Sequence, residues 1–148
     1  MRTPLTISLI SGAAATSFGW AWLAATTALA VHVIDEAAHD FLAWYNPRAL
    51  QIRHWLRGFP FPPMFTFLPW VLGLAAGVTV LVLLTPAAYE GRLWLRPVGY
   101  IVAGIHIGNG LFHLLASVIM RRRVPGVLSA PLLLVSGAWL AYAAATLN

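Results

Sequence analysis

PMFTFLPWVLGLAAGVTVLVLL, residues 63–84, carries no charged side chain along its whole length. A helix needs about 20 consecutive apolar residues to cross the hydrocarbon core of a bilayer. In that environment the backbone must satisfy its own hydrogen bonds, which a helix does within a single segment. The stretch therefore predicts a transmembrane helix, and it assigns the chain to the all-α membrane proteins.

The remainder of the chain has the composition of the same class. Of the 148 residues, 60% are hydrophobic and 9% are charged, whereas soluble domains are roughly half apolar and a quarter charged. Three further apolar blocks, at about residues 16–44, 93–120 and 126–147, are also long enough to span. We expect one domain, residues 1–148, built as a bundle of four transmembrane helices.

Proline, glycine and arginine mark the connections between these blocks. The first connection, YNPRALQIRHWLRGFPFPP at residues 45–63, predicts a short amphipathic or Pro-rich segment at the membrane interface. Six arginines lie in the first and third connections and three on the opposite side. Because arginine-rich loops stay in the cytoplasm, we expect both termini to be extracytoplasmic and the protein to be integral to a cytoplasmic membrane of the bacterial type.

Residues that the chain lacks exclude several chemistries. It has no cysteine, which removes disulfides, thiolate ligands and thiol nucleophiles. It has no lysine either, which removes Schiff-base chemistry on a lysine amine. The arginines that produce the net charge of +5 are topology signals in this composition, so we assign no nucleic-acid role.

Charged residues concentrate in VHVIDEAAHDF, residues 31–41, which holds three of the four carboxylates of the chain. At about 100° per residue, one arc of the first helix carries four polar side chains. These are His32, Asp35, Glu36 and His39. Asp40 falls at the edge of the arc, which suits a charge at the end of the helix.

The third apolar block has a polar face of its own in IHIGNGLFHLL, residues 105–115. His106, Asn109 and His113 share this face, and Gly104 and Gly108 on the opposite side predict close helix packing there. Counted from the cytoplasmic ends, His39 lies level with His113 and His32 with His106. We therefore expect the two faces to meet around one polar cavity.

A carboxylate at the centre of a spanning helix costs about 2.5–3.5 kcal/mol on insertion scales and usually marks function. Imidazole and carboxylate together suit zinc, iron or manganese, and Glu36-x-x-His39 has the spacing of carboxylate-bridged two-metal bundles. We predict a centre with one or two ions and the ligands His32, Glu36, His39, His106 and His113. The predicted catalytic residues are Asp35, Glu36 and Asn109, with Asp35 as a general base or an orienting group.

His32-Val33-Ile34-Asp35-Glu36 resembles the signature of the HXXEE family of membrane proteins. The N-x-x-x-H element of that family is matched by Asn109 and His113, and only Pro125 and Gly126 remain of a later Y-S-P-G-T element. Asp35 replaces the first glutamate of the signature. The resemblance implies a small integral membrane protein with an active site around these motifs, and it names no reaction.

The leading functional hypothesis is a metal-dependent membrane enzyme that acts on a lipid or another lipophilic small molecule. Hydrolysis, isomerisation and oxidoreduction all stay open. One alternative is a haem-binding or accessory subunit, in which His32 with His106 or His39 with His113 supplies axial ligands. Others are a proton or cation relay and a structural hydrogen-bond network. A homo-oligomer or a larger membrane complex is compatible with each.

Overall fold

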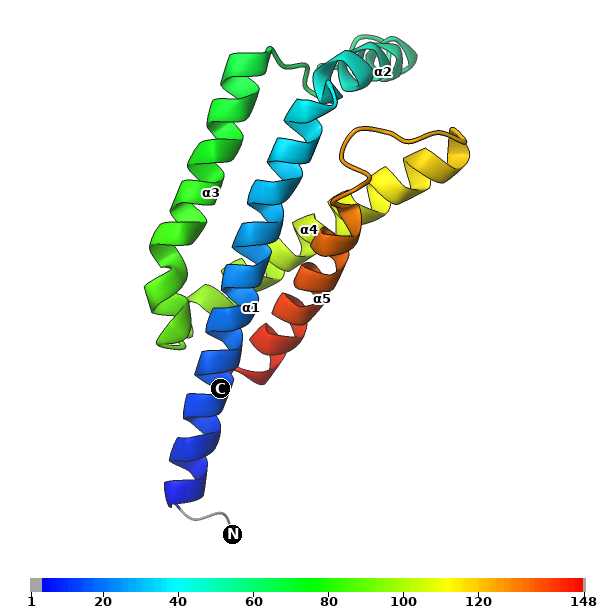
Figure 1. The fold of residues 1–148 in the computed structure, drawn as a ribbon. Coiled ribbons are helices and arrows are strands. Elements are labelled where there is room, and N and C mark those ends of the chain that lie inside the picture. The colour runs from blue at the N-terminus through cyan, green and yellow to red at the C-terminus, as the bar shows by residue number, and fades with distance from the viewer. Residues whose placement is uncertain (1–3, 148) are drawn as a thin grey trace.

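The computed structural model describes residues 4–147, with side chains from residue 12 onward. Within that range it contains five helices and no strand, which confirms the all-α prediction. Figure 1 shows their order along the chain. The helices are α1 (Pro4–Ala38), α2 (Phe41–Trp55), α3 (Phe67–Tyr89), α4 (Leu95–Ile119) and α5 (Ala130–Thr146).

Three helices in the described part are long and apolar enough to cross a membrane: residues Gly12–Ala38 of α1, the whole of α3 and the whole of α4. The fourth apolar helix, α5, has 17 residues, which is about 26 Å at 1.5 Å per residue. The hydrocarbon core is about 30 Å thick. The chain therefore has the helices of a membrane protein, while a count of four spans stays a prediction.

The helices pair as α1 with α3 and α4 with α5, and α5 also packs on α1 (Figure 1). Phe18 and Trp22 of α1 and Leu95 and Leu140 of the other pair form a fully buried core together with small alanines. The indole Nε1 of Trp22 donates to the carbonyl of Leu81 at 2.9 Å and so joins α1 to α3. By contrast, α4 is inclined to α1 and has less contact with it than with α5.

The glycine at the close contact of α4 is Gly110, and not the predicted Gly104 or Gly108. A Cβ atom added to Gly104 or Gly108 would meet nothing within 4 Å, whereas one on Gly110 would lie 2.9 Å from the carbonyl oxygen of Ala130. On the facing helix, a Cβ on Gly137 would lie 3.0 Å from the carbonyl oxygen of Ala103. The tight contact is therefore with α5, and it lies beside the polar face of α4 rather than opposite to it.

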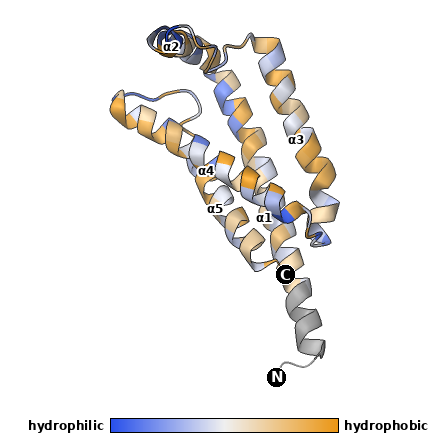
Figure 2. Cartoon of the chain, turned by 180° about the vertical axis from the view of Figure 1, so that it is seen from behind, coloured by the Kyte–Doolittle hydropathy of each residue, from blue (hydrophilic) through white to orange (hydrophobic). Residues whose placement is uncertain are grey.

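The first helix ends earlier than predicted, at Ala38 rather than near Trp44. Asp40 adopts φ 53° and ψ 46°, in the left-handed region, and this breaks the helix before α2 begins. Asp40 thus lies at a helix end, as expected. The segment predicted as interfacial is largely the helix α2, which leads away from the end of α1 (Figure 1). In Figure 2, α3 is mainly hydrophobic, and hydrophilic residues gather on α2 and the adjoining end of α1.

Candidate metal centre

Three of the predicted ligands meet where α1 and α4 come together. Glu36 Oε1 lies 3.1 Å from His113 Nε2 and 3.5 Å from His32 Nε2. The two imidazole rings meet edge to face, with centroids 4.8 Å apart. One donor atom from each residue lies within 4.8 Å of the others, and all three residues are buried. The helices thus deliver two imidazoles and one carboxylate to a volume the size of a single ion's coordination shell.

His113 is the least satisfied member of this cluster. Both of its ring nitrogens are buried without a hydrogen-bond partner among the described residues. Its Nε2 atom lies near Glu36 Oε1 at 3.1 Å, at ion-pair distance but without hydrogen-bond geometry. A buried polar atom without a hydrogen bond costs about 1–3 kcal/mol. This orphaned nitrogen, directed at a carboxylate, fits a metal ligand better than a structural hydrogen-bond donor.

Ser129 determines which nitrogen of His32 faces the cluster. The serine Oγ lies 2.7 Å from Asp35 Oδ2 and 2.7 Å from His32 Nδ1. A serine hydroxyl has one proton, and donating it to the carboxylate leaves the oxygen free to accept from His32 Nδ1–H. The Nε2 atom then carries the lone pair, and it accepts from the Asn109 amide at 3.1 Å. This arrangement presents the ligand-competent nitrogen of His32 to Glu36.

Ser129 was not among the predicted site residues. It occupies the N-cap position of α5, without a capping hydrogen bond from its side chain. This position lies outside the helical faces that periodicity compares. Its backbone N–H also donates to Asp35 Oδ2, at 3.0 Å, and the residue is 3% exposed. The one available signal was a serine immediately before the last apolar helix, a typical N-cap position.

Gly126, in the same connection, covers the two histidines from one side. Its φ is +83°, which L side chains rarely adopt, and a Cβ there would lie 2.7 Å from His113 Cε1 and 2.9 Å from His32 Cε1. Only glycine combines that backbone conformation with such a close approach. The packing against the two histidines therefore requires glycine at position 126.

His39 lies outside the cluster. Because α1 ends at Ala38, His39 belongs to the turn that follows and leaves the arc on which the sequence placed it. Its Nδ1 atom lies 2.9 Å from Asp35 Oδ1, and its side chain is 53% exposed. Asp35 therefore has His39 on one oxygen and Ser129 on the other.

His106 also lies apart from the cluster. It is 1% exposed, its Nδ1 atom is 3.4 Å from Ser136 Oγ, and its Nε2 atom has no partner among the described residues. The expected pairing of His32 with His106 at one depth is replaced by contact between His32 and His113. The depth comparison assumed parallel helices, whereas α4 crosses α1 at an incline (Figure 1).

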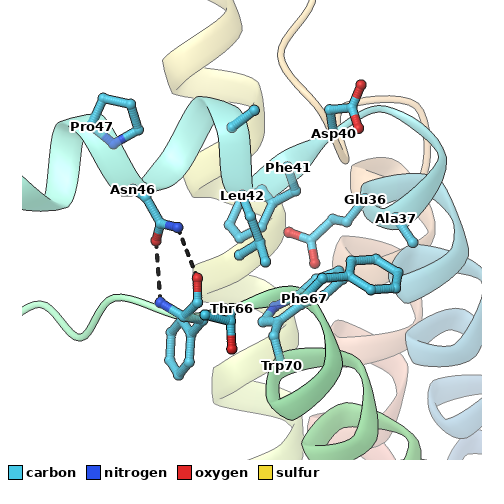
Figure 3. Close-up of a pocket in the computed structure, with 12 residues that line it drawn as sticks. Glu36, Ala37, Asp40, Phe41, Leu42, Asn46, Pro47, Thr66, Phe67 and Trp70 are labelled. Atoms are coloured by element: carbon cyan, nitrogen blue, oxygen red, sulfur yellow. Dashed lines mark hydrogen bonds between the residues drawn. The ribbon is translucent and has the colours of Figure 1, made fainter.

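Glu36 also lines a pocket of about 670 Å³ between the end of α1, α2 and the start of α3 (Figure 3). Phe41, Phe67 and Trp70 supply aromatic walls. Asn46 fixes the opposite side, because its amide donates to the Phe65 carbonyl at 2.8 Å and its oxygen accepts from the Phe65 N–H at 3.2 Å. The carboxylate of the cluster is thus in the wall of a largely apolar pocket.

A second, smaller pocket of about 430 Å³ joins Glu36 to Asn109 and is lined by Trp70 and Tyr45. The Tyr45 hydroxyl donates to the Pro63 carbonyl at 3.0 Å. Burial raises the pKa of the Tyr45 phenol, which keeps this group a neutral donor. Both pockets therefore approach the same carboxylate through aromatic side chains.

Comparisons with known proteins identify a family and no activity. No curated protein and no solved structure matches the chain. The family model described as "Protein of unknown function with HXXEE motif" matches residues 9–140, a range that includes all three clustered residues and their neighbours Asp35, Asn109 and Ser129. With most of its length covered by that match, the chain belongs to the HXXEE family.

Proposed function

We propose that this protein is a membrane-embedded, metal-dependent enzyme whose ion is bound by His32, Glu36 and His113. The observation that carries the proposal is the buried set of three donor atoms within 4.8 Å of one another. Two imidazoles and one carboxylate form a donor set that zinc and iron(II) accept, and manganese is compatible with it. Three protein ligands leave coordination positions free for water or substrate, which is the arrangement of catalytic sites.

The residues around the donors support a catalytic use of the ion. Asp35 holds Ser129, and Ser129 in turn orients His32, so Asp35 acts as a positioning residue. Asn109 donates to His32 Nε2, the nitrogen that would bind the ion, and with the ion bound its amide would be available to a substrate. A bound zinc would supply an activated water for hydrolysis or isomerisation, and iron would supply oxygen chemistry.

A lipophilic substrate fits the surroundings of Glu36. The pocket beside it is lined by Phe41, Phe67 and Trp70, and the neighbouring helices are apolar enough to lie in lipid. We further propose that α5 completes four spans, and that both termini are extracytoplasmic in a cytoplasmic membrane. The arginines of the α2 region and of the connection before α5 support this orientation.

A proton relay is the second candidate, and one observation favours it. Polar side chains follow one another from the exposed His39 through Asp35, Ser129 and His32 to the buried Glu36, with 3.5 Å between His32 Nε2 and Glu36 Oε1. Intramembrane series of this kind carry protons in pumps and transporters. Haem is not favoured, because His32 and His113 contact each other rather than their predicted partners and His39 is 53% exposed beside Asp35.

Elemental analysis of the detergent-purified full chain tests the metal proposal. Wild type is compared with Glu36→Gln, which keeps the volume and removes the charge. Glu90→Gln is the matched control, because Glu90 is exposed and pairs with Arg92. We expect about one ion per chain in wild type and in the control, and background levels in Glu36→Gln, with unchanged circular dichroism and elution volume.

Two results would overturn the proposal. One is a wild-type protein that holds no zinc, iron or manganese even after incubation with each ion. The other is a Glu36→Gln variant that retains the full stoichiometry. A metal-free wild type that moves protons across liposome membranes, and loses this activity in Ser129→Ala, would establish the relay instead.

A further inference from the structure

A third pocket, of about 750 Å³, is lined by Asp35 and lies between α2 and the connection from α4 to α5. Arg48 reaches it from α2, and Arg122 and Arg123 reach it from the connection. Segments far apart in the sequence thus bring three arginines to one pocket. We refer to it as the arginine pocket.

The three arginines have no carboxylate partner in the part of the chain that the structure describes. None of them takes part in an ion pair there, in contrast to Arg92, which pairs with Glu90. Two aspartates also line the pocket, but Asp35 is already occupied by Ser129 and His39. The pocket is lined by three arginines and two aspartates, and one of these aspartates, Asp35, already contacts other residues. The pocket therefore has an excess of positive charge.

The Arg48 guanidinium and the backbone of the connection are held in place, while the Arg122 and Arg123 side chains are exposed. The Arg48 guanidinium lies over the Trp44 ring, 4.6 Å from its centroid, and donates to the Trp44 carbonyl. The Arg122 carbonyl accepts from Ser117 Oγ at 2.7 Å. The following residues are anchored by Val124, which is 3% exposed, and by Gly126 on the histidines. Several guanidinium groups at one pocket are suited to the paired hydrogen bonds that phosphate oxygens accept.

The position and the other walls of the pocket indicate where such a phosphate comes from. The pocket begins where the apolar span of α1 ends, at Ala38. Trp44, Val127 and Leu128 add apolar surface next to the arginines. A free anion would use only the guanidinium groups, whereas a lipid would use the guanidinium groups and the apolar surface together.

We propose that the arginine pocket binds the phosphate of an anionic lipid headgroup, with the first part of the lipid chains on Trp44 and Leu128. Arginines in cytoplasmic loops also act as topology signals, but that role does not require them to converge. Arg53 shows the contrast, because its Nε donates to the Pro62 carbonyl at 2.8 Å and it does not line the pocket. The proposal is independent of the metal centre.

Binding of short-chain phosphatidic acid to the detergent-purified full chain tests this proposal, with native mass spectrometry or calorimetry as the readout. Arg122→Gln/Arg123→Gln removes two charges from the pocket, and Arg57→Gln/Arg121→Gln removes two charges outside it. We expect the affinity of the first variant to fall by about tenfold or more, since charge-assisted hydrogen bonds are lost. The second variant should stay within about twofold of wild type, as a general charge effect is small.

Two further ligands identify the source of the anion. Diacylglycerol with the same acyl chains lacks the phosphate, and it should bind neither to wild type nor to the two double variants. Inorganic phosphate should compete only at far higher concentration than phosphatidic acid. Equal losses in the two double variants, or phosphate that competes as well as the lipid, would overturn the lipid site. Metal content of the arginine variants should equal that of wild type, which separates this test from that of the metal centre.

Discussion

His113 and His106 occupy the same face of α4, two turns apart, and both are almost completely buried. Each has a ring nitrogen without a hydrogen-bond partner among the described residues. Their neighbours differ: His113 faces Glu36 and His32, whereas His106 faces Ser136 and a small apolar pocket that includes Leu29. Burial therefore does not distinguish the two imidazoles. The difference between them is the Glu36 carboxylate, which α1 places beside His113 and not beside His106.

The largest expected difference between these two regions is in metal stoichiometry. His113→Ala should reduce bound metal to background, because it removes one of three ligands. His106→Ala creates a similar cavity, at a similar cost of a few kcal/mol in stability, and should keep the wild-type stoichiometry. Elemental analysis of both variants in parallel checks this. Equal metal loss in both would mean that packing, and not ligation, controls the ion.

A smaller difference is expected from the serines beside the two histidines. Ser129→Ala leaves His32 Nδ1 and Asp35 without their shared partner. Loss of a group that orients a ligand typically lowers metal affinity by about 10–100-fold, and competition with a chromophoric chelator measures this. Ser136→Ala, beside His106, is the control and should leave the affinity unchanged. A Ser129→Ala protein with wild-type affinity would show that His32 needs no orienting partner.

The smallest effect should come from His39, which the sequence grouped with the ligands. Its exposed pair with Asp35 is worth less than about 1 kcal/mol, or less than about fivefold in affinity. His39→Ala should therefore stay within that range in the chelator assay, with one ion still bound. A loss of the ion in this variant would place His39 in the coordination shell and would require the turn at Asp40 to rearrange.

Helical periodicity predicted the part of the site that lies within regular helices. His32 and Glu36 are one turn apart on α1, and His113 and Asn109 are one turn apart on α4. Since the phase of a residue on a straight helix follows from its number alone, these side chains could be assigned to one cavity from the sequence. The apolar blocks predicted the all-α fold for the same reason, because length and composition are local properties.

The remaining features depend on tertiary geometry, which local patterns do not contain. The left-handed conformation of Asp40 ended α1 early and moved His39 off its face. Because α4 is inclined to α1, the neighbour of His32 is His113 and not the expected His106. Ser129 lies in a connection whose path has no period to analyse. Each departure concerns where a helix ends, how two helices cross, or how a loop returns.

Ser129 follows its partner Asp35 by 94 residues, and it comes immediately before the last helix. During synthesis the first helix is complete long before that serine exists. For this period Asp35 and Glu36 lack the partners that α4 and its following connection supply. Until then Asp35 has His39, and Glu36 has His32, as the neighbouring charge partner from its own part of the chain. The proposed ligand set is therefore complete only when α4 has been made, and the serine that orients His32 is made directly afterwards.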